Sequence, residues 1–311
     1  MAEAASRLVH IVDDVPELDG VEELTMVVAL TGFLDAGHAG ALAAAHLQSL
    51  GDAPVVATFD VDTLYDYRAR RPAVSFVQDH YEGYDAPRLV VRLCRDSGGT
   101  PFLLLRGPEP DFRWEGFCTA VHQVVERFGV TRVLSLGAVP MAVPHTRPIA
   151  VTHHANRTEL LTGTSPWRGV LRVPASVQAL LEIRLGEWGH DALGYTVHVP
   201  HYLAQMDYPV AAITLVEQLE IGGHLLVDLG ALRAKAVDCQ QEIADFLDEH
   251  EEVADVVEAL ERQYDTFQRA EEAGSSLLAS DEPLPTADDL GRQFEQFLAG
   301  LDGPADGDQS A

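Results

Sequence analysis

The stretch from Val27 to Gly40 constrains this chain more than any other part of its sequence. A short apolar run ends at Gly32, a short polar loop follows, and a segment rich in Ala, Gly and Leu continues to Leu50. This pattern is typical of a buried strand, a loop and a helix that packs closely on a sheet. Such a unit places helix N–H groups at the carboxyl end of the strand, where α/β proteins commonly hold ligands.

Further apolar runs predict more strands, with helices between them. The runs are short, rich in Val and Leu, and bounded by Gly, Pro or Asp. They are Thr25–Thr31, Val55–Phe59, Leu89–Cys94, Phe102–Arg106, Val133–Leu136, Ile149–His153 and Tyr195–Val199. The third and fourth runs flank a turn-rich segment, 95–101, so we expect them to form a β-hairpin. Together these features predict an α/β fold, a three-layer α/β/α sandwich with a mixed sheet.

Helical patterns lie between the predicted strands. The first expected helix is 36–50, which Gly51 ends, and the second is 114–128, which Asp111 caps. A third runs from Pro174 to about Trp188, and a fourth begins at Pro209 and ends by Gly222. After Val227 the chain changes character, because 229–270 has no strand signal and suits one or two amphipathic helices. These helices either pack on the core as a hairpin or form an arm that reaches a neighbouring subunit.

The chain therefore divides into three predicted regions. Residues 1–227 form the α/β core, 228–274 an acidic helical extension, and 275–311 a linker, a short helix over Thr286–Leu298 and a disordered tail. Between Glu242 and Glu272 there are twelve Asp or Glu residues against two Arg. This extension suits a basic protein partner.

The formal net charge of −28 argues against nucleic acid and against anionic membrane surfaces as partners, because both are bound through Lys and Arg. Three widely spaced cysteines, Cys94, Cys118 and Cys239, suggest neither a disulfide framework nor a metal site and fit a reducing compartment. The first ten residues lack the apolar core of a signal peptide, and no apolar run approaches the ~20 residues that span a bilayer. We therefore expect a cytoplasmic protein.

Three loops hold most of the candidate site residues, and we expect them to gather at one edge of the sheet. The first loop supplies an anion or carbonyl site at a helix N-terminus, although Asp35 could instead only cap that helix. The second packs acids, tyrosines and arginines together, which internal acid–Arg pairing would also explain. The candidates are Gly32, Asp35, Gly37 and His38, then Asp60, Asp62 and Tyr65, and finally Gly137, His145, Arg147, His154 and Asn156.

Glu109 follows a strand and precedes a helix, so it is either a general base or a solvated loop acid. His153 and His154 are adjacent in an extended run and point to opposite faces, so they cannot bind one metal from the same side. With no HExxH spacing, no metal site is predicted, and with no GxSxG motif, no serine nucleophile is predicted. Catalytic residues and cofactors stay undefined at this level.

Six short motifs occur in an order typical of one family. They are Gly32–Gly37, Leu104–Pro110, Val133–Ala138, His154–Asn156, Val199–Leu203 and Tyr208–Pro209. In this order the chain resembles the PAC2 family, named after a proteasome assembly chaperone, over roughly residues 20 to 300. More narrowly it resembles the actinobacterial branch, which adds an acidic helical extension and a tail like Asp281–Thr286.

The resemblance implies a core similar to nucleoside phosphorylases and self-association, commonly into trimers. The resemblance implies no settled activity. Some members are labelled ATP-grasp carboligases, but this sequence lacks the glycine-rich lid of such enzymes. Family chaperones that bind proteasomes often end in a hydrophobic-Tyr-any tripeptide, whereas this sequence ends in Gln309-Ser310-Ala311. Docking through an inserted C-terminal tail is therefore not expected. The motif order, the lack of a recognisable nucleophile or metal set, and the acidic helices together favour a non-enzymatic oligomeric binding or assembly protein. The alternative is a small-molecule enzyme of nucleosidase or ATP-dependent carboligase-like type.

Overall fold

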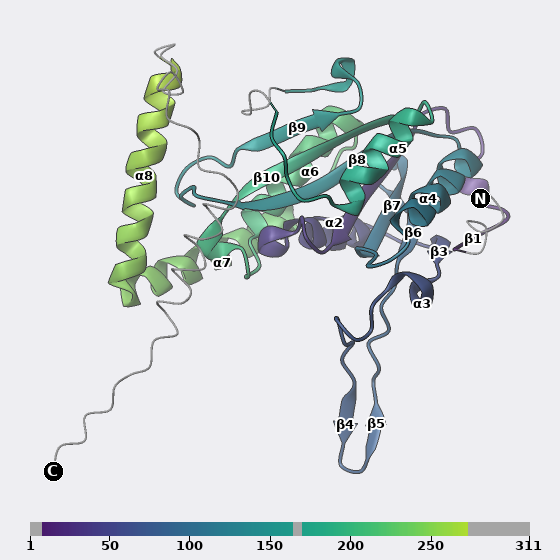
Figure 1. Cartoon of the computed structure of the whole chain (residues 1–311), viewed down its shortest axis with the longest axis horizontal. Coiled ribbons are helices and arrows are strands. Elements are labelled where there is room, and N and C mark those ends of the chain that lie inside the picture. Colours follow the sequence, from purple (N-terminus) through teal and green to yellow (C-terminus); the bar gives the residue numbers. More distant parts are fainter. Residues whose placement is uncertain (1–7, 164–169, 273–311) are drawn as a thin grey trace. The chain divides into compact units, whose positions relative to one another are not determined.

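The computed structural model describes residues 8–163 and 170–272 and is built around a mixed sheet of eight strands (Figure 1). The strand order is β1-β3-β6-β7-β2-β8-β10-β9. The strands are β1 (Val9–Ile11), β2 (Leu24–Thr31), β3 (Val55–Phe59), β6 (Val90–Arg95), β7 (Pro101–Pro108), β8 (Val130–Met141), β9 (Val151–Ala155) and β10 (Asp191–Pro200). All seven predicted strands are present, and the predicted hairpin is β6–β7.

The directions of the strands decide which loops share an edge. Strands β2, β7, β8 and β10 are parallel to their neighbours in this group, whereas β9 is antiparallel to β10. Because β3 is antiparallel to β6, and β6 is antiparallel to β7, β3 points the same way as β7. The carboxyl ends of β2, β3, β7, β8 and β10 therefore lie at one edge of the sheet, called the carboxyl edge below.

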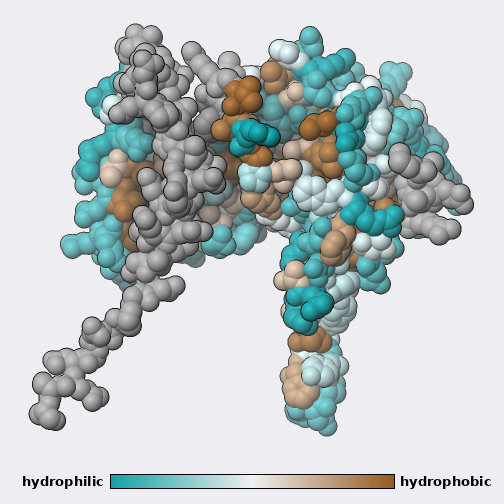
Figure 2. All heavy atoms as spheres, viewed as in Figure 1, coloured by the Kyte–Doolittle hydropathy of each residue, from teal (hydrophilic) through white to brown (hydrophobic). Residues whose placement is uncertain are grey.

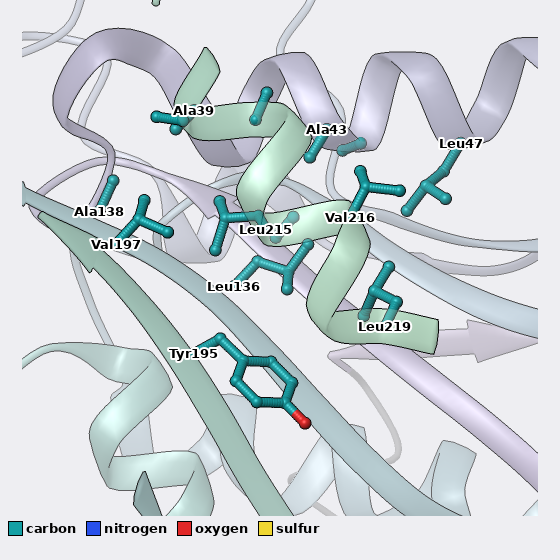
Figure 3. Close-up of a cluster of buried hydrophobic side chains, with 14 of the residues drawn as sticks. Ala39, Ala43, Leu47, Leu136, Ala138, Tyr195, Val197, Leu215, Val216 and Leu219 are labelled. Carbon is teal, nitrogen blue, oxygen red and sulfur yellow. The ribbon is translucent and has the colours of Figure 1, made fainter. Parts of the chain in front are cut away.

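Helices flank both faces of the sheet. The helices α2 (Ala39–Ser49) and α6 (Pro209–Gly223) cover one face, and α4 (Trp114–Phe128) and α5 (Val177–Glu187) cover the other. The remaining helices are α3 (Val61–Leu64), α7 (Gly230–Glu249) and α8 (Glu251–Glu272). On one face, Leu215 and Leu219 of α6 pack between α2 and strand residues such as Tyr195 (Figure 3). On the other face, Phe117 of α4 and Leu181 of α5 belong to a second buried cluster. The predicted α/β class with a mixed sheet is confirmed.

Several predicted boundaries were wrong for local reasons. Strand β8 is three times as long as its apolar run, because it pairs with β2 on one side and with β10 on the other. Helix α5 begins at Val177, where the Ser176 hydroxyl accepts a hydrogen bond from the Ala179 N–H at 3.1 Å, and not at Pro174. Asp111 does not cap α4, because its carboxylate accepts from Arg70 at 2.5 Å instead.

The predicted helical extension is present as two helices, α7 and α8. The described residues divide into a larger compact unit, 8–163 and 175–264, and a smaller one, 170–174 and 265–272. In the larger unit α7 packs on the core through four buried residues, Leu232, Ala236, Cys239 and Ile243. Of the two alternatives, packing on the core therefore holds for α7, rather than an arm to a neighbouring subunit. The predicted linker, the helix Thr286–Leu298 and the tail lie outside the described residues.

A separate two-stranded hairpin, β4 (Ser75–Val77) with β5 (His80–Glu82), extends away from the sheet (Figure 1). Each strand is only three residues long, too short for a pattern of alternating hydrophobicity to predict it. Across the part of the chain that the structure describes, no helix is long and apolar enough to cross a membrane.

Candidate functional site

Asp35 is the one acidic residue of the first loop, and its side chain is buried, at 8% exposure. Its Oδ1 accepts hydrogen bonds from the N–H groups of Gly40 at 2.8 Å and Ala41 at 3.3 Å, in the first turn of α2. Burial raises the pKa of this carboxyl to about 6, although the two N–H groups lower it. Asp35 therefore accepts the hydrogen bonds that cap α2, although His38 and not Asp35 occupies the N-cap position. Its pKa of about 6 lies well above that of an exposed carboxyl.

The rest of the first loop contacts the turn that follows β10. Gly37 has a φ of +63°, its N–H donates to the Ala204 carbonyl at 2.8 Å, and a Cβ there would lie 2.9 Å from the Tyr208 Cβ. The exposed His38 ring lies 2.7 Å from the Asp207 carboxylate. The Gly37 backbone thus serves close packing between two loops of the carboxyl edge.

Glu109 holds two elements together at the same edge. Its carboxylate accepts from the Val177 N–H at 2.7 Å, at the start of α5, and from the Phe33 N–H at 3.3 Å. A Cβ on Gly32 would lie 2.8 Å from Glu109 Oε2, so this glycine makes room for the carboxylate. Each carboxylate oxygen of Glu109 therefore accepts a hydrogen bond from a backbone N–H group. This matches neither of the two predicted roles, a solvated loop acid or a free general base.

The second loop satisfies most of its own polar groups. The Tyr67 hydroxyl donates to Asp62 at 2.6 Å, and the Thr63 hydroxyl donates to Asp60 at 2.6 Å. The Arg70 guanidinium lies 4.5 Å from the centre of the Tyr65 ring. These contacts match the alternative in which pairing within the loop accounts for its composition.

The third group splits between two edges of the sheet. His145 stays near the carboxyl edge, with Nδ1 2.7 Å from the Tyr202 hydroxyl, and burial lowers its pKa. Arg147 pairs with Glu261 of α8 at 3.4 Å. Asn156, in contrast, binds the His190 carbonyl at 2.7 Å, beside the first residues of β10. Because β9 is antiparallel to β10, its end lies at the amino end of β10, so the expectation of one shared edge was wrong for Asn156.

The strand residues of this group are also engaged with their neighbours. His154 lies 2.7 Å from Glu182 of α5, whereas the His153 ring packs against Tyr195 with ring centres 5.3 Å apart. The two histidines therefore point to opposite faces, as predicted. A Cβ on Gly137 would meet the Thr196 hydroxyl at 3.3 Å, so this glycine allows β8 and its neighbours to approach closely.

The larger surface hollows do not unite the candidate residues. Three hollows of about 340, 380 and 420 Å³ lie on the described part of the chain, and Asn156 is the sole candidate side chain among their linings. The first of these lies between α2 and strands β2, β6 and β7 at the carboxyl edge. It contains residues that the sequence analysis did not single out.

This first hollow, called the arginine hollow below, is lined by Arg88, Arg92 and Arg106. Arg106 donates to Gln48 of α2 at 2.5 Å, and Arg92 donates to the Ala53 carbonyl at 2.6 Å while its buried Nε has no hydrogen-bond partner. Within the described residues, none of the three arginines pairs with a carboxylate. Burial lowers the pKa of Arg106, and the positive charge of Arg92 lowers it further.

The signal for this cluster is present in the sequence but is weak. Arg92 and Arg106 interrupt two apolar strand runs, which is unusual for strands that are buried on both faces. Their proximity depends on the register of the β6–β7 hairpin, which places Arg92 opposite Leu104 and Arg106 opposite Val90. Two residues of the same face then meet diagonally.

Comparisons with known proteins agree with the motif order. The model of the PAC2 family matches residues 29–247. A Mycobacterium tuberculosis protein of unknown function is 47% identical, with a TM-score of 0.83 over 87% of this chain and 92% of that one. A Corynebacterium glutamicum protein of unknown function is 39% identical, with a TM-score of 0.79 over 84% and 98%.

A third similar structure has a functional description. It is a proteasome-assembly chaperone homologue from Mycobacterium tuberculosis, 29% identical, with a TM-score of 0.68 over 75% of this chain and 100% of that one. A search of proteins with curated functions found no match. The family model spans well over half of the sequence, and these three similar structures come from actinobacteria. This chain therefore belongs to the PAC2 family.

Proposed function

We propose that this chain is a non-enzymatic, self-associating binding protein of the assembly type. The observation that carries the proposal is the β4–β5 hairpin, which presents large apolar side chains to solvent (Figure 2). Phe76 is 60% exposed and Tyr81 is 72% exposed, and Val74 and Tyr84 flank them. Exposed apolar clusters of this kind mark interaction surfaces.

The hairpin lacks the packing that would stabilise it within one copy. All six strand residues are exposed, and Phe76 contacts Tyr81 across the ribbon with ring centres 5.0 Å apart. A two-stranded hairpin is marginally stable alone in water, so a covering surface would stabilise it. Aromatic side chains also supply much of the energy of protein interfaces.

We propose a second copy of this chain as the occupant of the hairpin. Two copies with a formal charge of −28 each repel through most of their surface, so apolar contacts must drive their association. The family resemblance implies self-association, commonly as trimers. The description of a related protein as a proteasome-assembly chaperone homologue supports an assembly role. The internal hydrogen bonds of Glu109 and Asp62 support a role without acid–base chemistry.

Replacing Phe76 and Tyr81 together with Ser is expected to weaken self-association at least 30-fold (about 2 kcal/mol), because two interface aromatics are lost. The unfolding free energy should stay nearly constant, since both side chains are exposed in one copy. Analytical ultracentrifugation over a concentration series measures the association constant. The control replaces the neighbouring cross-strand pair, Ser75→Ala with Glu82→Gln, and should leave assembly unchanged.

Two results would contradict this proposal. One is a wild-type chain that stays monomeric at every concentration. The other is an assembly that the Phe76 and Tyr81 replacements leave intact, which would assign the hairpin to a different protein partner. The acidic residues of α7 and α8 suit a basic partner, and that surface, like the cytoplasmic location, stays a prediction.

The arginine hollow favours a second candidate function, the binding of a small anionic ligand by an enzyme of nucleosidase or ligase type. Three guanidinium groups without carboxylate partners lie in a chain that is otherwise strongly acidic. Partly buried arginines of this kind are stabilised by a phosphate or carboxylate, which accepts their hydrogen bonds. A phosphate site would also suit the phosphorylase-like fold that the family resemblance implies.

Inorganic phosphate at about 100 times its dissociation constant is expected to stabilise the chain by about 2.7 kcal/mol. Arg92→Gln and Arg106→Gln should each remove most of this gain, because each loses a charged donor to the anion. Thermal unfolding with phosphate, and with chloride at equal ionic strength, measures the effect. Arg95→Gln is the matched control from the same strand, since the exposed Arg95 donates to Gly99 outside the hollow. A gain that persists in both hollow variants would exclude this site.

A further inference from the structure

A second cluster of chemically active side chains lies away from the carboxyl edge. His122 and Glu126 occupy successive turns of α4, and His190 lies in the connection from α5 to β10. The Nε2 atoms of the two histidines are 3.0 Å apart, and Glu126 Oε1 lies 3.0 Å from His190 Nε2 and 3.7 Å from His122 Nε2. Three metal-ligating atoms from two elements therefore point at one another.

These separations match the ligand shell of a small divalent cation. In a tetrahedral Zn²⁺ site with bonds of about 2.0–2.2 Å, neighbouring ligand atoms lie roughly 3.3–3.6 Å apart. The three atoms of this cluster span 3.0 to 3.7 Å, so slight adjustments would place all three around one ion. We infer that His122, Glu126 and His190 form a binding site for a divalent cation of the Zn²⁺ class.

The residues around the cluster hold both imidazole rings in place. Trp188 stacks on His122 with ring centres 4.5 Å apart and an angle of 27° between the planes. The backbone of His190 is fixed on both sides, because its N–H donates to Leu185 at 2.9 Å and its carbonyl accepts from Asn156 at 2.7 Å. Outer contacts that orient ligating side chains are a common feature of metal sites.

The electrostatics also favour a cation. Glu126 adds a negative charge and is 61% exposed at its side chain, so ions can reach the cluster. Three protein ligands leave a fourth position for water, as in zinc sites that are open to solvent.

The position of the cluster makes it independent of the proposed function. His190 immediately precedes β10, and α4 ends just before β8, so the cluster lies at the amino ends of these strands. The hairpin and the arginine hollow contribute none of its residues. A bound ion would link α4 to the α5–β10 connection, two segments that are far apart in the sequence.

The test is titration of the untagged full chain with Zn²⁺ by isothermal calorimetry in a buffer free of chelators. We expect one stoichiometric site, and we expect His122→Ala and His190→Ala each to weaken binding at least about 100-fold. His80→Ala is the matched control, because His80 lies near the carboxylates of Asp79 and Glu82 without a second histidine. It should leave the affinity unchanged.

A second readout separates binding from folding. Zn²⁺ at about 100 times its dissociation constant should raise the folding equilibrium constant roughly 100-fold in the wild-type chain and leave Glu126→Gln nearly unaffected. Glu126 is exposed, so this variant should fold even where His190→Ala does not. Co²⁺ should give the intense visible absorption of a tetrahedral nitrogen–oxygen site. Absence of a stoichiometric site, or unchanged affinity in His122→Ala, would show a hydrogen-bonded histidine pair only and would overturn the inference.

Discussion

Replacing Gly107 with Ala is expected to destabilise the fold by roughly 3–5 kcal/mol, because it combines backbone strain with overpacking. Gly107 has a φ of +142°, a conformation that side chains disfavour. A Cβ at this position would lie 2.3 Å from the Arg88 carbonyl oxygen and 2.8 Å from the Leu89 Cα. Both are backbone atoms, which cannot move aside as the end of a flexible side chain can.

The measurement is urea-induced unfolding of the wild type and the variant. Gly51→Ala is the matched control, because a Cβ on the exposed Gly51 has no heavy atom within 4 Å and its φ is not positive. It should change stability by no more than about 0.5 kcal/mol. Equal stability of both variants would mean that β7 tolerates a side chain beside Arg88. Since Gly107 also lines the arginine hollow, such a result would also argue against the backbone geometry described for that hollow.

The variant Asp35→Asn is expected to be more stable than the wild type near neutral pH, by about 3 kcal/mol. Burial raises the pKa of Asp35 from 3.8 to about 6, so the folded chain holds this proton more tightly than the unfolded chain does. The stability that the protonated group contributes is fully present below about pH 4 and is lost as pH rises through about 6. Asn avoids that loss, because it is neutral and keeps an oxygen to accept from Gly40.

Unfolding free energies of both proteins, measured from about pH 4 to about pH 8, test this expectation. The advantage of Asp35→Asn should be near zero at the acidic end and grow across the range in which the wild-type carboxyl ionises. Asp35→Ala, which also removes the acceptor for two N–H groups of α2, should show no such advantage. A difference between wild type and Asp35→Asn that does not change with pH would contradict the assigned cause.

A positive result would also bear on function. A buried carboxylate that costs stability at neutral pH, at the carboxyl edge of an α/β sheet, is typical of a group retained for binding or catalysis. Asp35 would then remain a candidate even though it caps α2. A negative result would mean that Asp35 serves only to accept hydrogen bonds at the start of α2.

Much of the fold was predictable from local patterns. Buried strands such as β2 and β3 appear as apolar runs, and the β6–β7 hairpin is predicted by the turn residues between its strands. The length of β8 was not predicted, because Thr131 and Arg132 at its start and Gly137–Met141 at its end join the sheet through pairing with neighbouring strands rather than as part of a continuous apolar run. The hairpin β4–β5 was missed for a similar reason, since each strand is very short.

The candidate site was predictable in part. The loops that hold Asp35 and Glu109 do lie at one edge, because strand direction follows from a parallel α/β arrangement. Asn156 does not, because the antiparallel direction of β9 leaves no trace in its own residues. Engagement of Glu109 with the Val177 N–H was equally hidden, since it joins residues 68 positions apart.

By itself the sequence determined the α/β class, the order of the motifs that mark the family, and the strongly acidic charge, because these depend on residue types and on spacing along the chain. Only the tertiary structure decided which polar groups meet. The approach of Arg92 to Arg106 depends on hairpin register, and that of His122 to His190 on the packing of α4 near the end of α5. The arginine contact needs the paired strands, and the histidine contact joins distant segments, so its geometry exists only once the helices have packed on the sheet.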